Sequence, residues 1–255
     1  MSTLVVFHAH PDDEAITTGG TMAKAAEAGH RVVLVVATRG ERGEVAEGYL
    51  RPGEELWQRR VEETHAAAGM LGVSRVEFLG YVDSGMAGLP TNDDPECFWQ
   101  ADVDEAAARL AAILTEERAD VLTAYDENGV YGHPDHIQVN RVGVRAGVMA
   151  GTPKVYLNTI NKDRVRRLIA EAFAQGGDDL PGDVDSDFDL GVSEELITTT
   201  VDVADYVDLK RKAMAAHASQ ISESSFFLAM PLERFRILFG QEDYILSARP
   251  PGLSE

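Results

Sequence analysis

The apolar stretch 32–36 limits the folds open to this chain more than any other stretch. It is a continuous run of Val and Leu inside the segment 31–37. Such a run is typical of a strand in a parallel sheet that is buried on both faces. Strand-like runs also occupy 4–7, 75–79, 120–125 and 154–157, and helix-like segments separate them. This alternation predicts an α/β fold: a Rossmann-like, mostly parallel sheet with helices on both faces.

The remaining segments complete one domain that spans 1–255. Helices are predicted at 15–28, 54–70, 101–118, 134–150, 163–175 and 206–218, and further strands at 198–203 and 244–246. The irregular stretch 80–100 is too long for a simple connection, so we expect it to carry function. The acidic segment 176–189 is predicted to be a mobile surface loop. No boundary divides the chain, and the C-terminal third, about 150–255, is expected to shape the outer part of a substrate pocket.

Two histidine motifs follow two of the predicted strands. The first strand runs into His8-Ala-His-Pro-Asp-Asp-Glu14, and His133-Pro-Asp-His136 follows the strand at 120–125. In the common strand order 3-2-1-4-5, strands 1 and 4 are neighbours, and ligands bind beyond the carboxyl ends of the strands at that point. We therefore expect the two motifs to face each other across one crevice.

The prolines predict the local geometry of both motifs. A residue before proline is driven into an extended conformation, which applies to His10 and His133. Proline is favoured at the first helical position, so Pro11 and Pro134 are expected to begin helices. The residues expected on the first turns of these helices are Asp12, Asp13, Asp135 and His136.

The two motifs contain more polar side chains than a buried core would accept without a functional role. They are His10, Asp12, Asp13, Tyr131, His133, Asp135 and His136. Two imidazoles and one carboxylate with an open position form the ligand pattern of hydrolytic zinc sites. Zinc lowers the pKa of bound water to about 7, and a neighbouring carboxylate can accept the proton of that water. The pattern predicts a metal-dependent hydrolase, with Zn²⁺ as the metal and Fe²⁺ suited to the same ligands.

Composition narrows the partners and the location. The formal net charge is −20 and no segment is rich in Lys and Arg, so neither a nucleic acid nor an anionic membrane is expected as a partner. The single cysteine, Cys97, excludes an internal disulfide and a cysteine zinc site. No signal-peptide pattern is present, and no apolar run approaches the roughly 18 residues of a membrane span. We expect a cytoplasmic protein that acts on a small molecule, and a homo-oligomer remains open.

The motifs resemble those of a known family. They are His10-Pro-Asp-Asp13 with Glu14, Gly19-Gly20, Thr38-Arg-Gly-Glu41, Arg60-Val-Glu-Glu63, Asp83-Ser-Gly-Met86 and His133-Pro-Asp-His136. Together they resemble the LmbE-like (PIG-L) zinc deacetylases, and they are nearest to the mycothiol-pathway N-acetylglucosaminyl-inositol deacetylases. The resemblance covers about 4–140, with a weaker echo at 213–220. No catalytic role is assigned to His217, which lies in this echo.

The resemblance implies a role for individual residues. The implied metal ligands are His10, Asp13 and His136, with Asp12 as general base. His133 would stabilise the transition state or protonate the leaving amine, Asp135 would orient the His133 imidazole, and Tyr131 would assist the oxyanion. Arg60 and Asp83 would contact the substrate.

Three functions follow from these observations. The first is a zinc-dependent hydrolase that removes acetyl from an N-acetylated amino sugar or its conjugate. The second is an amidase for mycothiol-like thiol conjugates, although Thr17 and Thr18 stand where the resemblance places a lysine in such enzymes. The third is a non-catalytic sugar- or nucleotide-binding domain, but no Gly-x-Gly-x-x-Gly follows the first strand.

Overall fold

A mixed sheet forms the centre of the molecule. The computed structural model describes residues 1–174 and 190–247. The strands of the sheet are β1 Thr3–His8, β2 Arg31–Thr38, β3 Arg75–Tyr81, β4 Val121–Tyr125, β5 Lys154–Thr159, β6 Thr199–Asp202 and β7 Gln241–Leu246. Their order is β3-β2-β1-β4-β5-β7-β6.

The predicted order of the first five strands is confirmed. These strands are parallel, and β1 pairs with both β2 and β4. The last two strands extend the sheet beyond β5 in the antiparallel direction, because β7 pairs with β5 and with β6. The predicted strands at 198–203 and 244–246 correspond to β6 and to the second half of β7.

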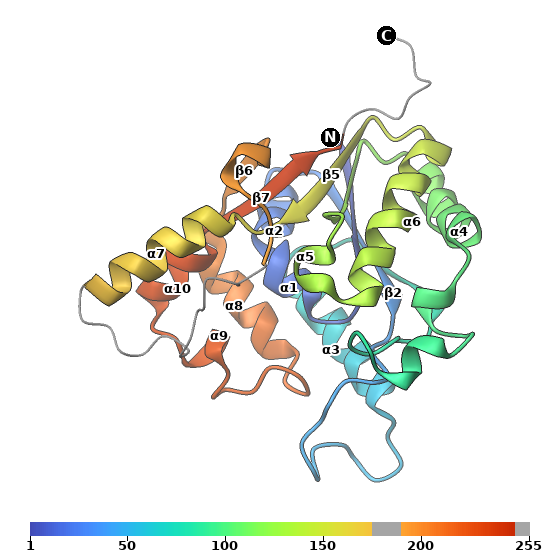
Figure 1. Cartoon of the computed structure of the whole chain (residues 1–255), viewed down its shortest axis with the longest axis horizontal. Helices are drawn as coiled ribbons and strands as arrows, with labels where there is room; N and C mark the ends of the chain where they lie inside the picture. The colour runs from blue at the N-terminus through green and yellow to red at the C-terminus, as the bar shows by residue number, and fades with distance from the viewer. Residues whose placement is uncertain (175–189, 248–255) are drawn as a thin grey trace.

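Helices cover both faces of the sheet, as predicted (Figure 1). On one face, α4 Val103–Glu117 and α6 Pro134–Ala150 pack over apolar side chains of β1, β2 and β4. The opposite face carries α1 Asp13–Thr17, α2 Gly19–Glu27, α3 Leu56–Met70, α8 Val207–Ala216 and α10 Leu232–Phe239. The remaining helices are α5 Gly129–Gly132, which contacts α6 and β5, α7 Lys162–Ala174, and α9 Phe226–Ala229, which contacts α8.

Local differences from the sequence prediction concern the ends and continuity of elements. The helix predicted at 15–28 is interrupted at Thr18, where φ is −132°, so it forms α1 and α2. The irregular stretch 80–100 contains the short 3-10 helices η1 Pro90–Asp93 and η2 Phe98–Gln100. Two more, η3 Glu194–Leu196 and η4 Ala204–Tyr206, flank β6. The predicted loop at 176–189 falls outside the described residues.

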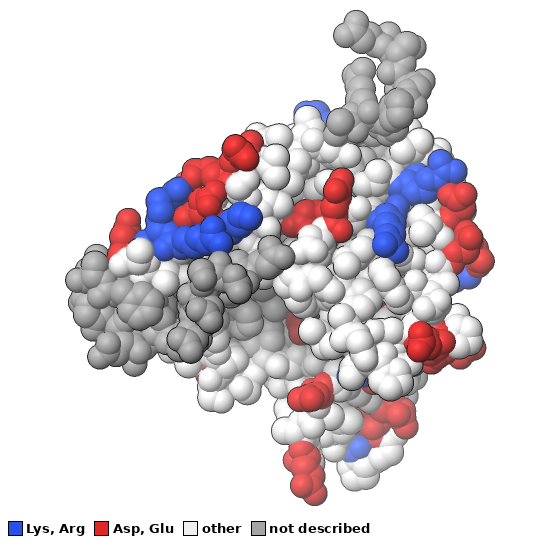
Figure 2. All heavy atoms as spheres, viewed as in Figure 1, with Lys and Arg blue, Asp and Glu red and all other residues white. Residues whose placement is uncertain are grey.

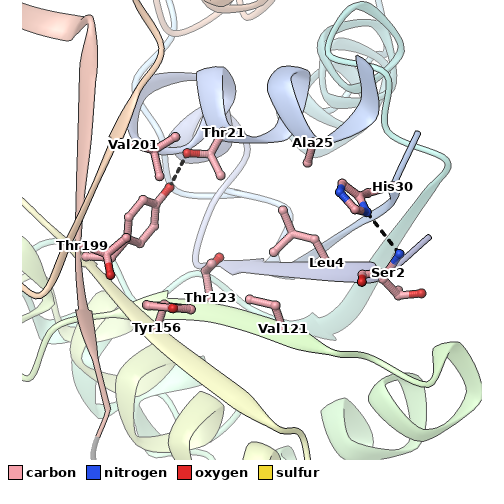
Figure 3. Close-up of a pocket in the computed structure, with 12 residues that line it drawn as sticks. Ser2, Leu4, Thr21, Ala25, His30, Val121, Thr123, Tyr156, Thr199 and Val201 are labelled. Carbon is pink, nitrogen blue, oxygen red and sulfur yellow. Dashed lines mark hydrogen bonds between the residues drawn. The ribbon is translucent and has the colours of Figure 1, made fainter. Parts of the chain in front are cut away.

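The surface carries mixed charges, and one cavity lies away from the histidine motifs. On the face shown in Figure 2, acidic side chains flank the basic ones, and no continuous basic surface forms. None of the helices in the described residues has the length and apolar character needed to cross a bilayer. A cavity of about 350 Å³, lined by Leu4, Val121 and Tyr156 among others, lies at the amino ends of β1 and β4 (Figure 3). It is therefore at the opposite end of the strands from the histidine motifs.

Candidate active site

The two histidine motifs meet at the carboxyl ends of β1 and β4. The imidazole of His10 lies 4.7 Å from that of His133 and 5.4 Å from that of His136, measured between ring centroids. All three histidines are at most 8% exposed. The juxtaposition follows from the pairing of β1 with β4, which carries the segment after each strand to the same edge of the sheet.

Asp13 lies between two of these imidazoles. Its Oδ2 is 3.4 Å from His10 Nδ1 and 3.4 Å from His136 Nε2. Ligand atoms about 2.0 Å from a tetrahedral zinc ion are about 3.3 Å apart, so these separations suit a shared ion. Two imidazoles and one buried carboxylate are also the donor types that zinc prefers. The contacts of Asp13 with both imidazoles therefore suit a divalent metal, and the assignment of these three residues as its ligands stays a prediction.

Hydrogen bonds decide which imidazoles have a lone pair to offer. His10 Nε2 contacts Asp135 Oδ2 at 3.0 Å, which leaves Nδ1 directed toward Asp13. His133 Nδ1 accepts a hydrogen bond from the Asp135 amide at 3.1 Å. A neutral His133 must then carry its proton on Nε2, and it cannot bind a metal through that atom. This hydrogen bond argues against His133 as a metal ligand, although one of its nitrogens lies within 4.8 Å of nitrogens of His10 and His136 and the three could together hold an ion.

The charges around His10 favour a cation. Burial lowers the pKa of His10, but the carboxylates of Asp83, Asp13 and Asp135 outweigh burial and raise this pKa well above its usual value. The same negative potential that holds a proton on the imidazole would attract a divalent metal in its place.

Asp135 differs from its predicted role. Its side chain is fully buried, and it accepts hydrogen bonds from the Ser84 amide at 2.9 Å and from the Ser84 hydroxyl. Its remaining contact is with His10, not with His133. The resemblance implied that this carboxylate orients His133, whereas in the structure the main-chain amide of Asp135 does so. The carboxylate instead fixes the orientation of His10.

The backbone at Asp12 also departs from the prediction. Pro11 does not begin a helix, because α1 starts at Asp13 and Asp12 precedes it with φ of 96° and ψ of −32°. The Asp12 amide donates a hydrogen bond to Glu14 Oε2 at 2.9 Å, and this bond turns the chain away from a regular first turn. At the second motif the prediction is confirmed: His133 is extended and Pro134 is the first residue of α6.

The Asp12 carboxylate is suited to accept a proton. Its side chain is 18% exposed, more than that of Asp13 at 11%. Burial raises the pKa of Asp12 to about 6, and the guanidinium of Arg60, 3.5 Å away, only partly offsets this. A carboxylate with this pKa is mostly ionised near pH 7 and still basic enough to take a proton from an attacking water.

Tyr131 stands at the mouth of the site in α5, a short helix in which Val130 and Tyr131 have non-helical backbone angles. Its hydroxyl is 3.4 Å from His136 Nε2, and the residue is 47% exposed. The preceding Val130 has φ of 69°, and Asp126 Oδ1 holds its amide at 2.9 Å. Gly129 allows α5 to pass close to α6, because a Cβ there would be 2.6 Å from His136 Cβ. Burial raises the pKa of Tyr131, so its hydroxyl stays a proton donor at neutral pH.

The two predicted substrate-binding residues lie deeper than expected of a substrate contact. Arg60 is 3% exposed and donates to the carbonyls of Gly40 at 3.0 Å and Pro11 at 2.5 Å. Asp83 is 5% exposed, accepts from the Gly85 amide at 2.8 Å and lies 3.6 Å from His10 Nε2. In this structure both side chains contact other residues of the site: Arg60 binds main-chain carbonyls, and Asp83 lies beside His10. Direct contact with substrate stays a prediction.

Several residues of the site were not in the predicted set. His8 is buried and contacts Tyr125 Oη at 2.6 Å, and the Tyr125 ring stacks on His136 at 4.4 Å with an interplanar angle of 9°. Glu14 and His217 are both fully buried and contact each other at 2.5 Å. The sequence contained a hint of both residues, because Glu14 ends the first histidine motif and His217 lies in the 213–220 segment that resembles the family.

Known proteins resemble this chain along nearly its whole length. The family described as GlcNAc-PI de-N-acetylase (PIG-L) matches residues 5–147. A protein from Thermobifida fusca named 1D-myo-inositol 2-acetamido-2-deoxy-α-D-glucopyranoside deacetylase is 41% identical over 94% of this chain and 93% of its own length. The similarity therefore extends through the C-terminal third, beyond the 4–140 region in which the motifs were recognised.

Solved structures share the fold at low identity. N,N′-diacetylchitobiose deacetylase from Pyrococcus horikoshii matches 96% of this chain and 83% of its own with a TM-score of 0.63 and 21% identity. The 4-carboxy-2-hydroxymuconate hydratase of Pseudomonas putida matches 100% of this chain and 99% of its own with a TM-score of 0.61 and 20% identity. Since a hydratase and a deacetylase share this architecture, the chemistry has to be argued from the site residues.

Proposed function

Because this chain belongs to the PIG-L family of GlcNAc-PI de-N-acetylases, we propose that it is a metal-dependent hydrolase that deacetylates an N-acetylated amino sugar of the N-acetylglucosaminyl-inositol type. The products are acetate and a free amine. The names of the relatives support this substrate class.

The observation that carries the proposal is the placement of Asp12 beside a set of metal-binding side chains. His10, Asp13 and His136 would hold the metal, which is zinc in this proposal, with iron suited to the same donors. When bound, such an ion polarises a carbonyl and lowers the pKa of water. Asp12 directly precedes Asp13, and the nearby Arg60 guanidinium only partly offsets the burial that raises the pKa of the Asp12 carboxyl group.

The protein's own residues then divide the proton transfers among themselves. Asp12 accepts the proton of the attacking water and returns it to the nitrogen of the leaving amine as the C–N bond breaks. Burial, together with His10 and His136, lowers the pKa of His133 to about 4, so His133 is neutral near pH 7 and acts through its Nε2–H. His133 and the Tyr131 hydroxyl would donate hydrogen bonds to the oxyanion that develops on the amide oxygen.

A fluorescamine assay for new primary amine tests the proposal. The purified protein is incubated with N-acetylglucosaminyl-inositol, simpler N-acetylglucosamine derivatives and chitooligosaccharides, with and without a chelator. We expect amine release from the inositol conjugate that the chelator abolishes and added Zn²⁺ restores. Asp12→Asn should lower kcat by about 10²–10⁴-fold, the usual contribution of a general base, while the metal content is unchanged.

The control and the contradicting outcomes are defined by the same assay. Asp93→Asn makes the same change of charge on the exposed η1 and should leave kcat unchanged. Amine release only from thiol conjugates of the mycothiol type would indicate the amidase instead. No amine from any substrate by the metal-loaded protein would contradict the deacetylase and leave a binding domain.

A further inference from the structure

The backbone of Asp12 adopts a conformation that needs support. Among the described residues only Asp12, Arg118 and Val130 have positive φ without being glycine. At φ 96° and ψ −32°, Asp12 also lies outside the left-handed helical region that Asp and Asn tolerate. Such conformations persist only where neighbouring groups fix them, and they cluster at functional sites.

Hydrogen bonds fix the peptide on both sides of Asp12. The Asp12 amide donates to Glu14 Oε2 at 2.9 Å, and the carbonyl of Pro11, on the same peptide unit, accepts from Arg60 at 2.5 Å. The Asp12 carbonyl accepts from the amides of Ala15 and Ile16 at 3.0 and 3.1 Å. The conformation of the predicted base is therefore set from outside its own side chain, and Glu14 supplies the contact to its amide.

Glu14 is in turn held from the other end of the chain. Its Oε1 lies 2.5 Å from Nε2 of His217, at the C-terminal end of α8, and both side chains are fully buried. A buried carboxylate has to be paired, and this one has its two oxygens directed to two different partners. The imidazole thus fixes the orientation in which Glu14 reaches the Asp12 amide.

The His217 side chain is fully buried and faces Glu14. Its Nε2 contacts Glu14 Oε1 at 2.5 Å, so the imidazole is placed to act on Asp12 through Glu14. We infer that Glu14 and His217 form a positioning pair that holds the Asp12 backbone at positive φ and so aims its carboxylate into the site. The inference rests on the proposed function in so far as Asp12 is the base, while the pair itself is defined by hydrogen bonds alone.

Two amide substitutions of His217 separate positioning from general packing. In His217→Gln the side-chain nitrogen falls near the position of the histidine Nε2 and can still donate to Glu14. In His217→Asn the nitrogen corresponds to Nδ1 and falls short. Misplacement of a catalytic group by about 1 Å can cost about 10²-fold in rate. We expect His217→Asn to lower kcat by about 10–100-fold with KM within about twofold, and His217→Gln to recover most of kcat.

Ser219→Ala is the matched control in the same segment. Ser219 is 7% exposed, and its hydroxyl donates to Glu63 at 2.6 Å, not to Asp12 or Glu14. Its loss should lower the melting temperature and leave kcat within about twofold. Equal losses of kcat in Ser219→Ala and His217→Asn would overturn the inference, because both would then act through general destabilisation.

A double-mutant cycle and an activity-free measurement complete the test. If His217 acts through Asp12, His217→Asn should have no further effect on the residual kcat of Asp12→Asn, and an undiminished second loss would overturn the inference. In ¹⁵N–¹H spectra, the Asp12 amide resonance should shift in His217→Asn and not in Ser219→Ala. An unmoved resonance would also overturn the pair. Lack of amine release by the wild type, with this shift present, would instead contradict the proposed function alone.

Discussion

Replacing Asp135 by Asn would distinguish two roles for this residue. The carboxylate accepts from the Ser84 amide at 2.9 Å and from the Ser84 hydroxyl, and it contacts His10 Nε2 at 3.0 Å. Asn has the same size, but it lacks the charge that strengthens these bonds. The main-chain amide that orients His133 is unchanged by the substitution. The variant therefore perturbs the support of His10 and spares that of His133.

The size of the effect follows from the contact to His10. Removing a group that orients a metal-bound histidine typically lowers metal affinity by about 10–100-fold, or about 1.4–2.7 kcal/mol. Asn can turn its oxygen toward His10 and keep a neutral hydrogen bond, so we expect about tenfold for Asp135→Asn. Asp135→Ala removes the acceptor altogether and should approach a hundredfold.

The assay is competition for Zn²⁺ against a chromophoric chelator, together with kcat at saturating zinc. We expect the affinity to fall while kcat at saturation stays within about tenfold of the wild type. Ser84→Ala is a graded control, because it removes the hydroxyl that contacts the other carboxylate oxygen. A kcat that collapses at saturating metal, with unchanged zinc affinity, would show that the carboxylate serves His133 and would refute the role read from the structure.

Two further predictions concern stability. Lys210 and Glu242 form a buried ion pair at 2.6 Å. Glu242→Leu leaves the Lys210 ammonium buried without this partner and should lower the free energy of unfolding by about 3–5 kcal/mol. Urea titrations should show a larger loss for Glu242→Leu than for Lys210→Met. The hydrogen bond from Arg31 holds the pKa of Glu117 at about 2, so Glu117 stabilises the fold above about pH 4.5 and loses this effect as the pH falls toward 2. Glu117→Gln should cost about 1–2 kcal/mol at pH 7 and almost nothing at pH 2, whereas the exposed Glu116→Gln should change little at either pH.

The sequence predicted the parallel half of the sheet because the apolar runs carry that information directly. Continuous runs such as 32–36 have no polar face, and only a strand covered on both sides buries them. The antiparallel edge was less accessible to prediction. The strand β6 alternates between half-buried and exposed positions, and the first half of β7 contains Gln241, Glu242 and Asp243. These acids suggest a loop, but Glu242 and Asp243 are buried because they pair with Lys210 and Arg164.

The site was predictable in its residues and less so in its geometry. Short spacing and the prolines place the candidate ligands at the ends of β1 and β4, and the structure brings them together there. The positive φ of Asp12 was not predictable, because it depends on Glu14. The partners of the Asp135 carboxylate were also not predictable, because Ser84 and His10 contact it from two other segments of the chain. Local rules specify which residues are near the site, and long-range hydrogen bonds decide which atoms face one another.

The C-terminal third was predicted to shape the outer pocket, and that remains a prediction; its described residues also reach beneath the first motif. His217 contacts Glu14 from α8, and Glu242 on β7 accepts from the amides of Gly20 and Thr21 at 2.9 and 2.8 Å, at the start of α2. Lys210 lies about two helix turns before His217, and its ion pair with Glu242 adds to these contacts. The first motif, which carries His10, Asp12 and Asp13, is thus supported at Glu14 and at the start of α2 by residues more than 200 positions away in the sequence. The first motif supplies the chemistry, but its geometry depends on a part of the chain that contains no predicted metal ligand.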